Sequence, residues 1–204
     1  MTTVPQLGDY DVFDSIAIDD LWCMDKLILA KKLGYSCGPA GMVPLVPGQY
    51  VVRPIWNLRS MSIGATIQYL DSDSIPDGYF WSEIFTGRHL SFDYHWGKQT
   101  LAVEGFRTDP LRLDRFSQWT KIDEVFALPE ILQTVADRYE WFNVEVIGDR
   151  IIEVHFRYNP NFVNHNATTI IPVWRDEFYP SYDSGDRLGF ILKDNIELTK
   201  QDKQ

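Results

Sequence analysis

The 204-residue sequence predicts an α+β fold with largely antiparallel sheets and few helices. The first indication is the order of elements, in which one early helix is followed by many strands, a second helix and a hairpin. The second is an alternation of apolar and polar residues, which is typical of antiparallel strands with one covered face. The third is the turn pair Gly148-Asp149 between two β-branched runs, which predicts a hairpin. No internal repeat or linker interrupts the chain, so we expect one compact domain over residues 1–204.

Two segments carry helix signals. Apolar residues recur at helical spacing over 18–34, where Asp19 or Asp20 can cap the start and Gly34 can end the helix at the C′ position. Residues 129–139 begin with proline, which favours the first helical position, N1. We therefore expect these two helices on either side of the strand-rich middle of the chain.

The remaining regular elements are predicted to be strands joined by loops. The strands outside the hairpin are expected at 49–55, 66–71, 79–86, 88–96, 99–107, 116–121, 169–174 and 187–193. Irregular segments are expected at 1–17, 35–48, 56–65, 160–168, 179–186 and 198–204. Three prolines and three glycines within residues 35–48 predict that this stretch contains no regular element.

Composition narrows the class of function and the compartment. The net charge of −10, from 19 basic and 29 acidic residues, argues against non-specific nucleic-acid binding but leaves room for a local phosphate groove. Cys23 and Cys37 have no metal-ligand partner at useful spacing, which favours free thiols in a reducing cytosol. No signal peptide and no apolar run of the roughly 20 residues needed for a membrane span are present, so we expect a cytoplasmic protein without membrane contact.

The hairpin over residues 141–161 carries an unusual row of polar side chains. Strict alternation places one set of residues on one face and a second set on the other. The first set is Ile151, Glu153, His155 and Arg157, and the second is Ile152, Val154, Phe156 and Tyr158. Glu145 on the preceding strand faces the first set across the hairpin. This row indicates either a binding site or an ordinary solvated sheet face, and the pattern alone does not decide between them.

Common nucleotide and nucleophile motifs are missing. The sequence contains no phosphate-binding P-loop, no dinucleotide glycine motif after a strand and no nucleophile elbow. The polar strand residues that remain are Arg53, Glu83, His89, Glu145, Glu153, His155 and Arg157. Two carboxylates on neighbouring strands suit Mg²⁺, and arginines suit phosphate oxygens. The alternative for the same residues is a cross-strand ladder of ion pairs.

Four stretches, taken in order, resemble the motifs of ATP-grasp ligases. Residues 25–39 resemble the family's Asp-Lys helix with its following Gly and Pro, and residues 50–54 resemble the strand whose basic residue touches ATP phosphates. Residues 81–89 resemble the hinge strand that holds adenine. Residues 144–157 resemble the paired metal strands. The resemblance spans about residues 20–160, which leaves the rest as accessory loops and strands.

This resemblance implies a role for each matching residue. The nucleotide would be held by Lys26, Arg53, Glu83, Ile84, Phe85 and His89. The metal ligands would be Glu145, Glu153 and His155, and the catalytic residue would be Arg157. The implied activity is an ATP- and Mg²⁺-dependent ligase that joins a carboxylate to an amine or thiol through an acylphosphate. Its substrates would be small-molecule or peptide carboxylates and amines, with a protein partner or second copy completing the substrate site.

The amino-acid sequences of residues 32–41 and 153–160 also resemble those of small ATP-grasp proteins encoded by bacteriophages. This resemblance implies a location in the host cytoplasm.

The chain departs from the family in three places. Residues 57–65 hold one glycine where the family has a glycine-rich phosphate loop, His155 stands in place of an asparagine, and about twenty residues precede the Asp-Lys helix where family ligases carry a further α/β domain. These departures favour the alternative hypothesis that the chain is a non-catalytic nucleotide-binding or protein-interaction protein. A third hypothesis is that the chain is an unrelated α+β domain with an aromatic ligand-binding face.

Overall fold

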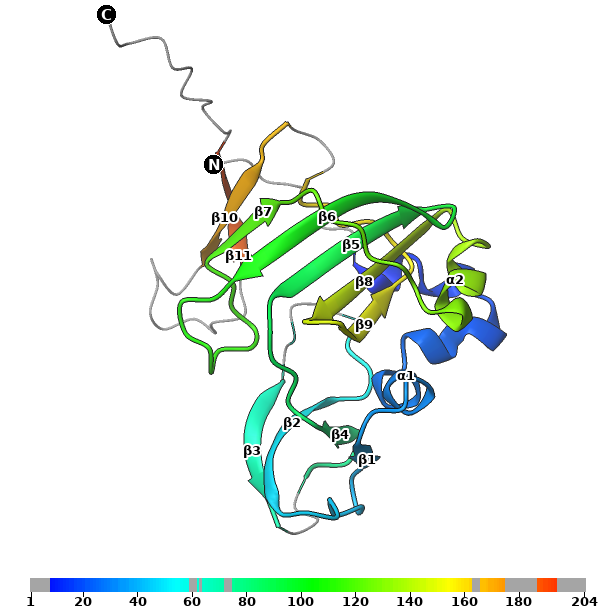
Figure 1. Cartoon of the computed structure of the whole chain (residues 1–204), viewed down its shortest axis with the longest axis vertical. Helices are drawn as coiled ribbons and strands as arrows, with labels where there is room; N and C mark the ends of the chain where they lie inside the picture. Colours follow the sequence, from blue (N-terminus) through cyan, green and yellow to red (C-terminus); the bar gives the residue numbers. More distant parts are fainter. Residues whose placement is uncertain are drawn as a thin grey trace, which may run out of the picture.

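The strands of the described residues form two sheets (Figure 1), and their antiparallel pairing is as predicted. The computed structural model describes residues 8–58, 62, 64–71, 75–162, 166–174 and 187–193. The smaller sheet has the order β1-β4-β2-β3. Its strands are β1 (Cys37–Pro39), β2 (Gly48–Pro54), β3 (Thr66–Leu70) and β4 (Tyr79–Ser82).

The larger sheet has the order β11-β10-β7-β6-β5-β8-β9. Its strands are β5 (His89–His95), β6 (Lys98–Phe106), β7 (Gln118–Lys121), β8 (Trp141–Ile147), β9 (Arg150–His155), β10 (Thr169–Trp174) and β11 (Arg187–Lys193). The strand pairs within both sheets are antiparallel. The predicted fold class, α+β with largely antiparallel sheets, is therefore confirmed for the described part of the chain.

The predicted helix over 18–34 is divided into two elements. A 3-10 helix covers Ile18–Cys23, and α1 covers Lys26–Lys32. The capping residue is Asp25 rather than Asp19 or Asp20, since its Oδ1 accepts a hydrogen bond of 2.8 Å from the Ile28 amide. The end of the helix is as predicted, because Gly34 adopts a φ of 77° just after the last turn.

Two further predictions need correction. The helix α2 covers Glu130–Ala136, and Pro129 is its N-cap rather than its first helical residue, with an extended ψ of 144°. The segment 35–48 is not wholly irregular, because Cys37–Pro39 forms β1 by pairing with the edge of β4. A strand of three residues can form wherever the edge of another strand is available for pairing, and the number of prolines and glycines in a segment does not predict such pairing. The predicted turn-rich stretch 179–186 and the tail 198–204 lie outside the described residues.

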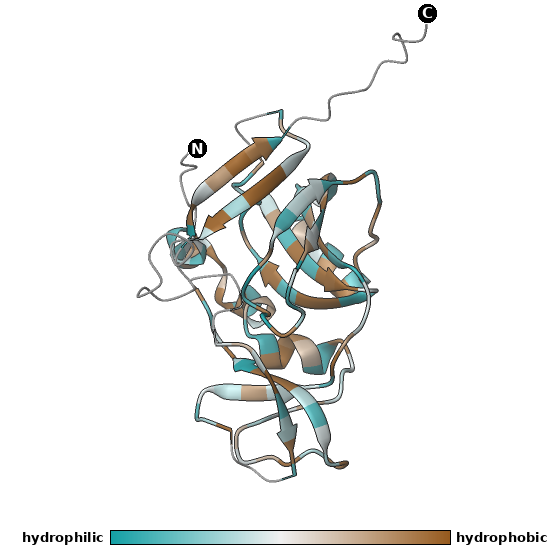
Figure 2. Cartoon of the chain, turned by 90° about the vertical axis from the view of Figure 1, so that its left-hand side faces the viewer, coloured by the Kyte–Doolittle hydropathy of each residue, from teal (hydrophilic) through white to brown (hydrophobic). Residues whose placement is uncertain are grey.

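The main core lies on one face of the larger sheet, where α2 and the segment before α1 cover it (Figure 1). The buried apolar side chains there include Met24, Leu29, Phe92, Leu132, Phe142 and Val144. A second cluster fills the other end of this sheet, and its largest members are Phe116, Trp119, Phe162 and Phe190. Figure 2 shows the apolar residues of the β10–β11 hairpin and of the neighbouring strands. In the described part of the chain, no helix is long and apolar enough to cross a membrane.

The β8–β9 hairpin departs from strict alternation at one residue. Glu145 pairs with Glu153, but Val146 pairs with Ile151, so the register shifts by one and Ile152 forms a bulge. Strict alternation predicted that Ile151 shares the polar face with Glu153. Because of the bulge, Ile151 instead packs in the main core with Val154. The bulge leaves the polar row of Glu153 and the residues after it intact.

The turn of this hairpin is closed by two glycines in contact. Gly148 has a φ of 65°, and a Cβ placed on it would lie 2.7 Å from the Thr86 carbonyl oxygen. Gly87 has a φ of 125°, and its Cβ would lie 2.8 Å from the Gly148 Cα. The close approach fixes the start of β5 against the hairpin turn.

We expect Gly148→Ala to lower the free energy of unfolding more than Gly78→Ala does, as measured by denaturant titration. Gly78 has a φ of 79° with no atom within 4 Å of its Cβ position, so alanine there meets only the backbone strain of about 1–2 kcal/mol. Alanine at Gly148 meets the same strain and a clash with backbone, which adds about another 1–3 kcal/mol. Equal losses at the two positions would contradict the proposed close packing.

Candidate functional site

The predicted site residues meet where α1, the smaller sheet and the β8–β9 hairpin adjoin (Figure 1). Lys26, the first residue of α1, places its Nζ 3.0 Å from the Glu153 Oε1 of β9. Both side chains are almost fully buried, at 6% and 5% exposure. A surface lysine, which is the ordinary fate of this residue type, is therefore excluded for Lys26.

Arg53 joins the smaller sheet to the larger one. It lies near the end of β2, is buried, and donates a hydrogen bond of 2.9 Å from Nη2 to the carbonyl of the bulge residue Ile152. Burial lowers the pKa of Arg53, and the charges of Glu153 and Glu145 oppose that shift. Arg53 thus lies on the same side of the fold as both acids. Its Nε is buried with no hydrogen-bond partner among the described residues.

The two acids face each other across the hairpin. Glu145 and Glu153 are direct partners in the β8–β9 register. The Glu145 Oε2 lies 3.1 Å from the His89 Nε2 of β5. Burial would raise the pKa of Glu145, but the neighbouring His155 and His89 side chains hold it well below its ordinary value. Glu145 therefore carries negative charge at neutral pH.

His155 is held from its other side by an aspartate. Its Nδ1 lies 2.9 Å from both carboxylate oxygens of Asp9, and its Nε2 points toward Glu145 and Glu153 at 3.8 and 3.9 Å. This Nε2 is buried and has no hydrogen-bond partner among the described residues. Burial would lower the pKa of His155, but the Asp9 charge raises it to about 9. The imidazole is consequently protonated at neutral pH in this arrangement.

Asp9 also binds Arg157, whose Nε donates to it at 2.8 Å. Burial would raise the pKa of Asp9, but His155 and Arg157 lower it to about 2. Sequence reasoning missed this residue because residues 1–17 carry no periodic pattern. Its partners lie almost 150 positions away, and only the folded chain brings them together. The sequence offers no signal that distinguishes Asp9 from the other aspartates near the N-terminus.

The predicted adenine-reading residues lie in the segment that joins β4 to β5. The Glu83 carboxylate accepts a hydrogen bond of 2.9 Å from the Ser36 amide, and the Glu83 amide donates back to the Ser36 carbonyl. Phe85 packs edge-on against Tyr35, and Ile84 is 38% exposed. These contacts tie the joining segment to the chain before β1, and a role in adenine binding stays a prediction.

One cavity beside the charged residues, bounded by described residues, is very small. A cavity of about 10 Å³ is bounded by Lys26, Arg53, Pro54, Asn57, Ser62, Ala65 and Glu153. This volume holds about one water molecule. A nucleotide needs a pocket of several hundred Å³. Binding of a nucleotide in this cavity would therefore require the side chains that bound it to separate.

The side chains of Glu145, Glu153 and His155 are chemically suited to bind a divalent cation, but their present spacing is not. A histidine that gives one ring nitrogen to a carboxylate and directs the other at two acids has the surroundings of many metal-ligating histidines. Two carboxylates are also what Mg²⁺ takes from proteins when phosphate and water complete its shell. Even so, no group of three acidic, histidine or cysteine side chains in the described residues is arranged to hold a metal ion. The ammonium of Lys26 is bound to Glu153 instead.

Comparisons with known proteins find similarity at the level of structure. No protein-family model and no curated protein matches the sequence. A protein assigned to the ATP-grasp superfamily from Archaeoglobus fulgidus is 18% identical with a TM-score of 0.46, over 84% of this chain and 64% of that one. An L-amino acid ligase from Bacillus licheniformis is 12% identical with a TM-score of 0.46, over 72% and 43%. A D-alanine–D-alanine ligase from Bacillus anthracis is 18% identical with a TM-score of 0.37, over 66% and 56%.

This chain therefore spans less than two thirds of the length of each of these proteins. With TM-scores below 0.5, the similarities support no conclusion about activity. The functional argument rests on the residues of this chain and on where the fold places them.

We expect Asp9→Asn to lower the free energy of unfolding by about 3–5 kcal/mol, because it leaves two buried cations without their shared carboxylate. The pH dependence should change with it. Since the folded pKa of His155 is about 9 and its ordinary value is 6.5, its contribution is complete below pH 6.5 and is lost as the pH rises through 9. Stability should fall over this window in the native protein, measured with a chelator present, and much less in Asp9→Asn.

The matched control is Asp11→Asn. Asp11 is exposed, and within the described ranges its side chain accepts a hydrogen bond from the nearby Gly8 amide alone. We therefore expect its loss to change stability by less than about 1 kcal/mol and to preserve the pH dependence. A native protein whose stability is flat between pH 6.5 and 9 would contradict the assigned charge of His155.

Proposed function

We propose that this chain binds ATP with Mg²⁺ between its two sheets and uses the nucleotide to join a carboxylate to an amine or thiol. The observation that carries the proposal is the convergence of Lys26, Arg53, Glu145 and Glu153 from three separate motif stretches at one buried place. The order of these motifs resembles ATP-grasp ligases, and a metal–triphosphate is a ligand that requires both cations and acids.

The charges at the site favour an anionic ligand. Lys26, Arg53, Arg157 and protonated His155 lie near the carboxylates of Asp9, Glu145 and Glu153. The buried carboxyl of Asp93, whose pKa burial raises to about 6, also interacts with Arg157 and His155. Cationic groups in a low-dielectric setting attract anions such as phosphate. The unpartnered Nε of Arg53 can donate to a phosphate oxygen, because guanidinium groups bind phosphate through several N–H donors.

Binding would exchange partners at the site. The Lys26 ammonium would leave Glu153 for phosphate oxygens, and Arg53 would hold the same phosphates from the smaller sheet. Glu145, Glu153 and the Nε2 of His155 would then hold Mg²⁺, with His155 giving up its proton and keeping Asp9 on its other nitrogen. When bound, the metal would neutralise charge on the phosphate oxygens. Glu83 and the backbone of Ile84 and Phe85 would contact adenine, and His89 would contact the ribose or stay with Glu145.

The reaction proceeds in two displacements. A carboxylate oxygen attacks the γ-phosphorus, the bond to the bridging oxygen breaks, and ADP leaves behind an acylphosphate. The amine nitrogen or thiol sulfur then attacks the acyl carbon, phosphate departs, and the nucleophile loses its proton to solvent. Arg157, oriented by Asp9, would stabilise charge on the transferring phosphoryl group. The chain contributes chiefly position and charge, as phosphoryl transfer requires.

A second function is favoured by the size of the cavity. Room for about one water beside Lys26, Arg53 and Glu153 fits a protein in which the ion pairs are structural. In that case the chain would bind a nucleotide without turning it over, or would act through protein interactions alone. The two experiments below separate these outcomes.

Millimolar ATP with Mg²⁺ should raise the thermal midpoint of the full chain, because a ligand bound only to the native state stabilises it by about 2.7 kcal/mol at one hundred times its Kd. Glu153→Gln should remove the part of the shift that depends on Mg²⁺. The control Glu140→Gln changes an acid that is 64% exposed, and it should retain the full shift. No shift in the native protein, or an equal Mg²⁺-dependent shift in Glu153→Gln, would contradict the proposal.

Catalysis can be tested by trapping the acylphosphate intermediate. With ATP, Mg²⁺ and a panel of carboxylic acids, added hydroxylamine should intercept the acylphosphate as a hydroxamate, with one ADP released for each. Arg157→Lys should slow this release at least about tenfold, since lysine lacks the planar fork that neutralises a phosphoryl group. A nucleotide-dependent thermal shift without ADP release for any acid in the panel would favour the non-catalytic function.

A further inference from the structure

His89, the first residue of β5, is buried and has a charged side chain at each of its ring nitrogens. Its Nε2 lies 3.1 Å from the Glu145 Oε2. Its Nδ1 lies 3.2 Å from the Nη2 of Arg107, the residue that follows β6. The resemblance to ATP-grasp ligases implied that His89 holds the nucleotide. In this structure both of its nitrogens are within hydrogen-bonding distance of side chains of the chain itself.

Arg107 determines which nitrogen of His89 carries the proton. A guanidinium stays protonated in proteins and has no acceptor atom, so the Nη2 of Arg107 donates and the Nδ1 of His89 accepts. The ring proton is then on Nε2, which donates it to Glu145. The opposite tautomer would set N–H against N–H at Arg107 and a lone pair against a carboxylate at Glu145.

The guanidinium of Arg107 is fixed by its other contacts. Its Nη2 also donates to the Leu113 carbonyl at 3.1 Å, and its central carbon lies 4.0 Å from the centre of the Phe116 ring. Burial lowers the pKa of Arg107, and the charges of Glu145 and Asp114 oppose that shift. The charge of Glu145 therefore acts on Arg107 across the imidazole ring.

Two aromatic rings fix the plane of the His89 ring. The ring centres of Phe116 and Trp119 lie 4.8 and 5.7 Å from that of His89, with interplanar angles of 76° and 86°. Gly105 pairs with His89 on β6, and a Cβ at this glycine would lie 2.6 Å from the nearest atom of these rings. The glycine thus allows both rings to cover the imidazole, which limits its rotation.

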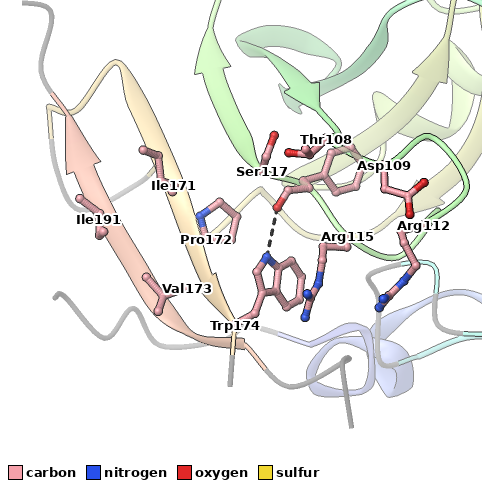
Figure 3. A pocket seen from close by; sticks show the side chains of 11 residues that line it. Thr108, Asp109, Arg112, Arg115, Ser117, Ile171, Pro172, Val173, Trp174 and Ile191 are labelled. Atoms are coloured by element: carbon pink, nitrogen blue, oxygen red, sulfur yellow. Dashed lines mark hydrogen bonds between the residues drawn. The ribbon is translucent and has the colours of Figure 1, made fainter. Parts of the chain in front are cut away.

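Phe116 is in turn held from the side away from His89. The Nε1 of Trp174 on β10 donates a hydrogen bond of 3.2 Å to the Phe116 carbonyl (Figure 3). This contact borders a cavity of about 480 Å³ between the loop after β6 and the β10–β11 hairpin. The loop is therefore anchored to β5 through Arg107 and to β10 through Phe116. Such support keeps the imidazole in one orientation toward Glu145.

We propose that Arg107 and His89 are positioning residues that hold the Glu145 carboxylate in one orientation. The Nε2–H of His89 binds Oε2, and the other oxygen, Oε1, lies 3.8 Å from the Nε2 of His155. Carboxylates that serve as ligands are commonly oriented by such a hydrogen bond from a second residue. His89 then takes no direct part in holding the nucleotide. The effect on nucleotide binding rests on the proposed function, whereas the orientation of His89 does not.

The orientation is tested without nucleotide, from the nitrogen chemical shifts of the histidine rings in the full chain at neutral pH. His89→Phe keeps a ring between the aromatic walls and identifies the His89 signals among the four histidines. We expect an unprotonated Nδ1 and a protonated Nε2. Arg107→Met should shift the Nδ1 signal, because that nitrogen loses its donor. Arg88→Met, at a half-exposed arginine next to His89, is the control and should retain the native signals.

The consequence for the site is tested with ATP and with dideoxyadenosine triphosphate, which lacks both ribose hydroxyls, each in the presence of Mg²⁺. His89→Phe should raise both dissociation constants at least about tenfold, because the two ligands need the same oriented acid. Arg107→Met should also weaken both, and the double variant should bind no more weakly than His89→Phe, since Arg107 acts through His89. Arg88→Met should bind as the native chain does.

The proposal is overturned by a protonated Nδ1 in the native chain or by an unchanged Nδ1 signal in Arg107→Met. It is also overturned by losses that add in the double variant, or by a loss in His89→Phe confined to ATP, which would assign His89 to the ribose. If the native chain binds neither nucleotide, the proposed function fails, and the nitrogen shifts alone decide whether Arg107 and His89 orient Glu145.

Discussion

The buried ion pair between Lys26 and Glu153 is the contact on which the arrangement of the site depends. Two charges removed from water are costly unless each finds a close partner, and apolar residues of similar size are often as stable in the same place. The pair also fixes the start of α1 against β9, at the point where Arg53 reaches across from the smaller sheet. A fold that needed only stability would gain little from this arrangement, which is why we interpret it as functional.

The same constraint explains the position of the N-terminal segment. His155 is the last residue of β9 and Arg157 follows two residues later, and two adjacent buried cations would repel each other. Asp9 neutralises both and is completely buried in doing so. The 3-10 helix Asp9–Asp11, which carries this aspartate, therefore belongs to the site. Together with a second 3-10 helix at Phe13–Ser15, it corrects the prediction that residues 1–17 are wholly irregular.

Much of the fold follows from local signals, and the contacts between distant segments do not. The hairpin was predictable because Gly148 and Asp149 separate two β-branched runs, and the convergence of Arg53 with Glu145 was predictable because the motif order resembles a known family. The bulge at Ile152 could not be predicted, because strict alternation assumes that every residue of one strand has a partner on the other. Ile152 has no such partner on β8. The capping role of Asp25 was hidden among three nearby aspartates with similar propensity. The contacts of Asp9 join distant positions, for which a single sequence carries no periodic pattern.

The central claim is that the paired charges between the two sheets open to receive a metal–triphosphate. It is tested most directly by a crystal structure with Mg²⁺ and a non-hydrolysable ATP analogue. We predict that the phosphates lie between Arg53 and the β8–β9 hairpin, with the Lys26 ammonium moved from Glu153 to a phosphate oxygen. A structure that holds the analogue elsewhere, or that keeps the Lys26–Glu153 pair closed at saturating analogue, would contradict the claim.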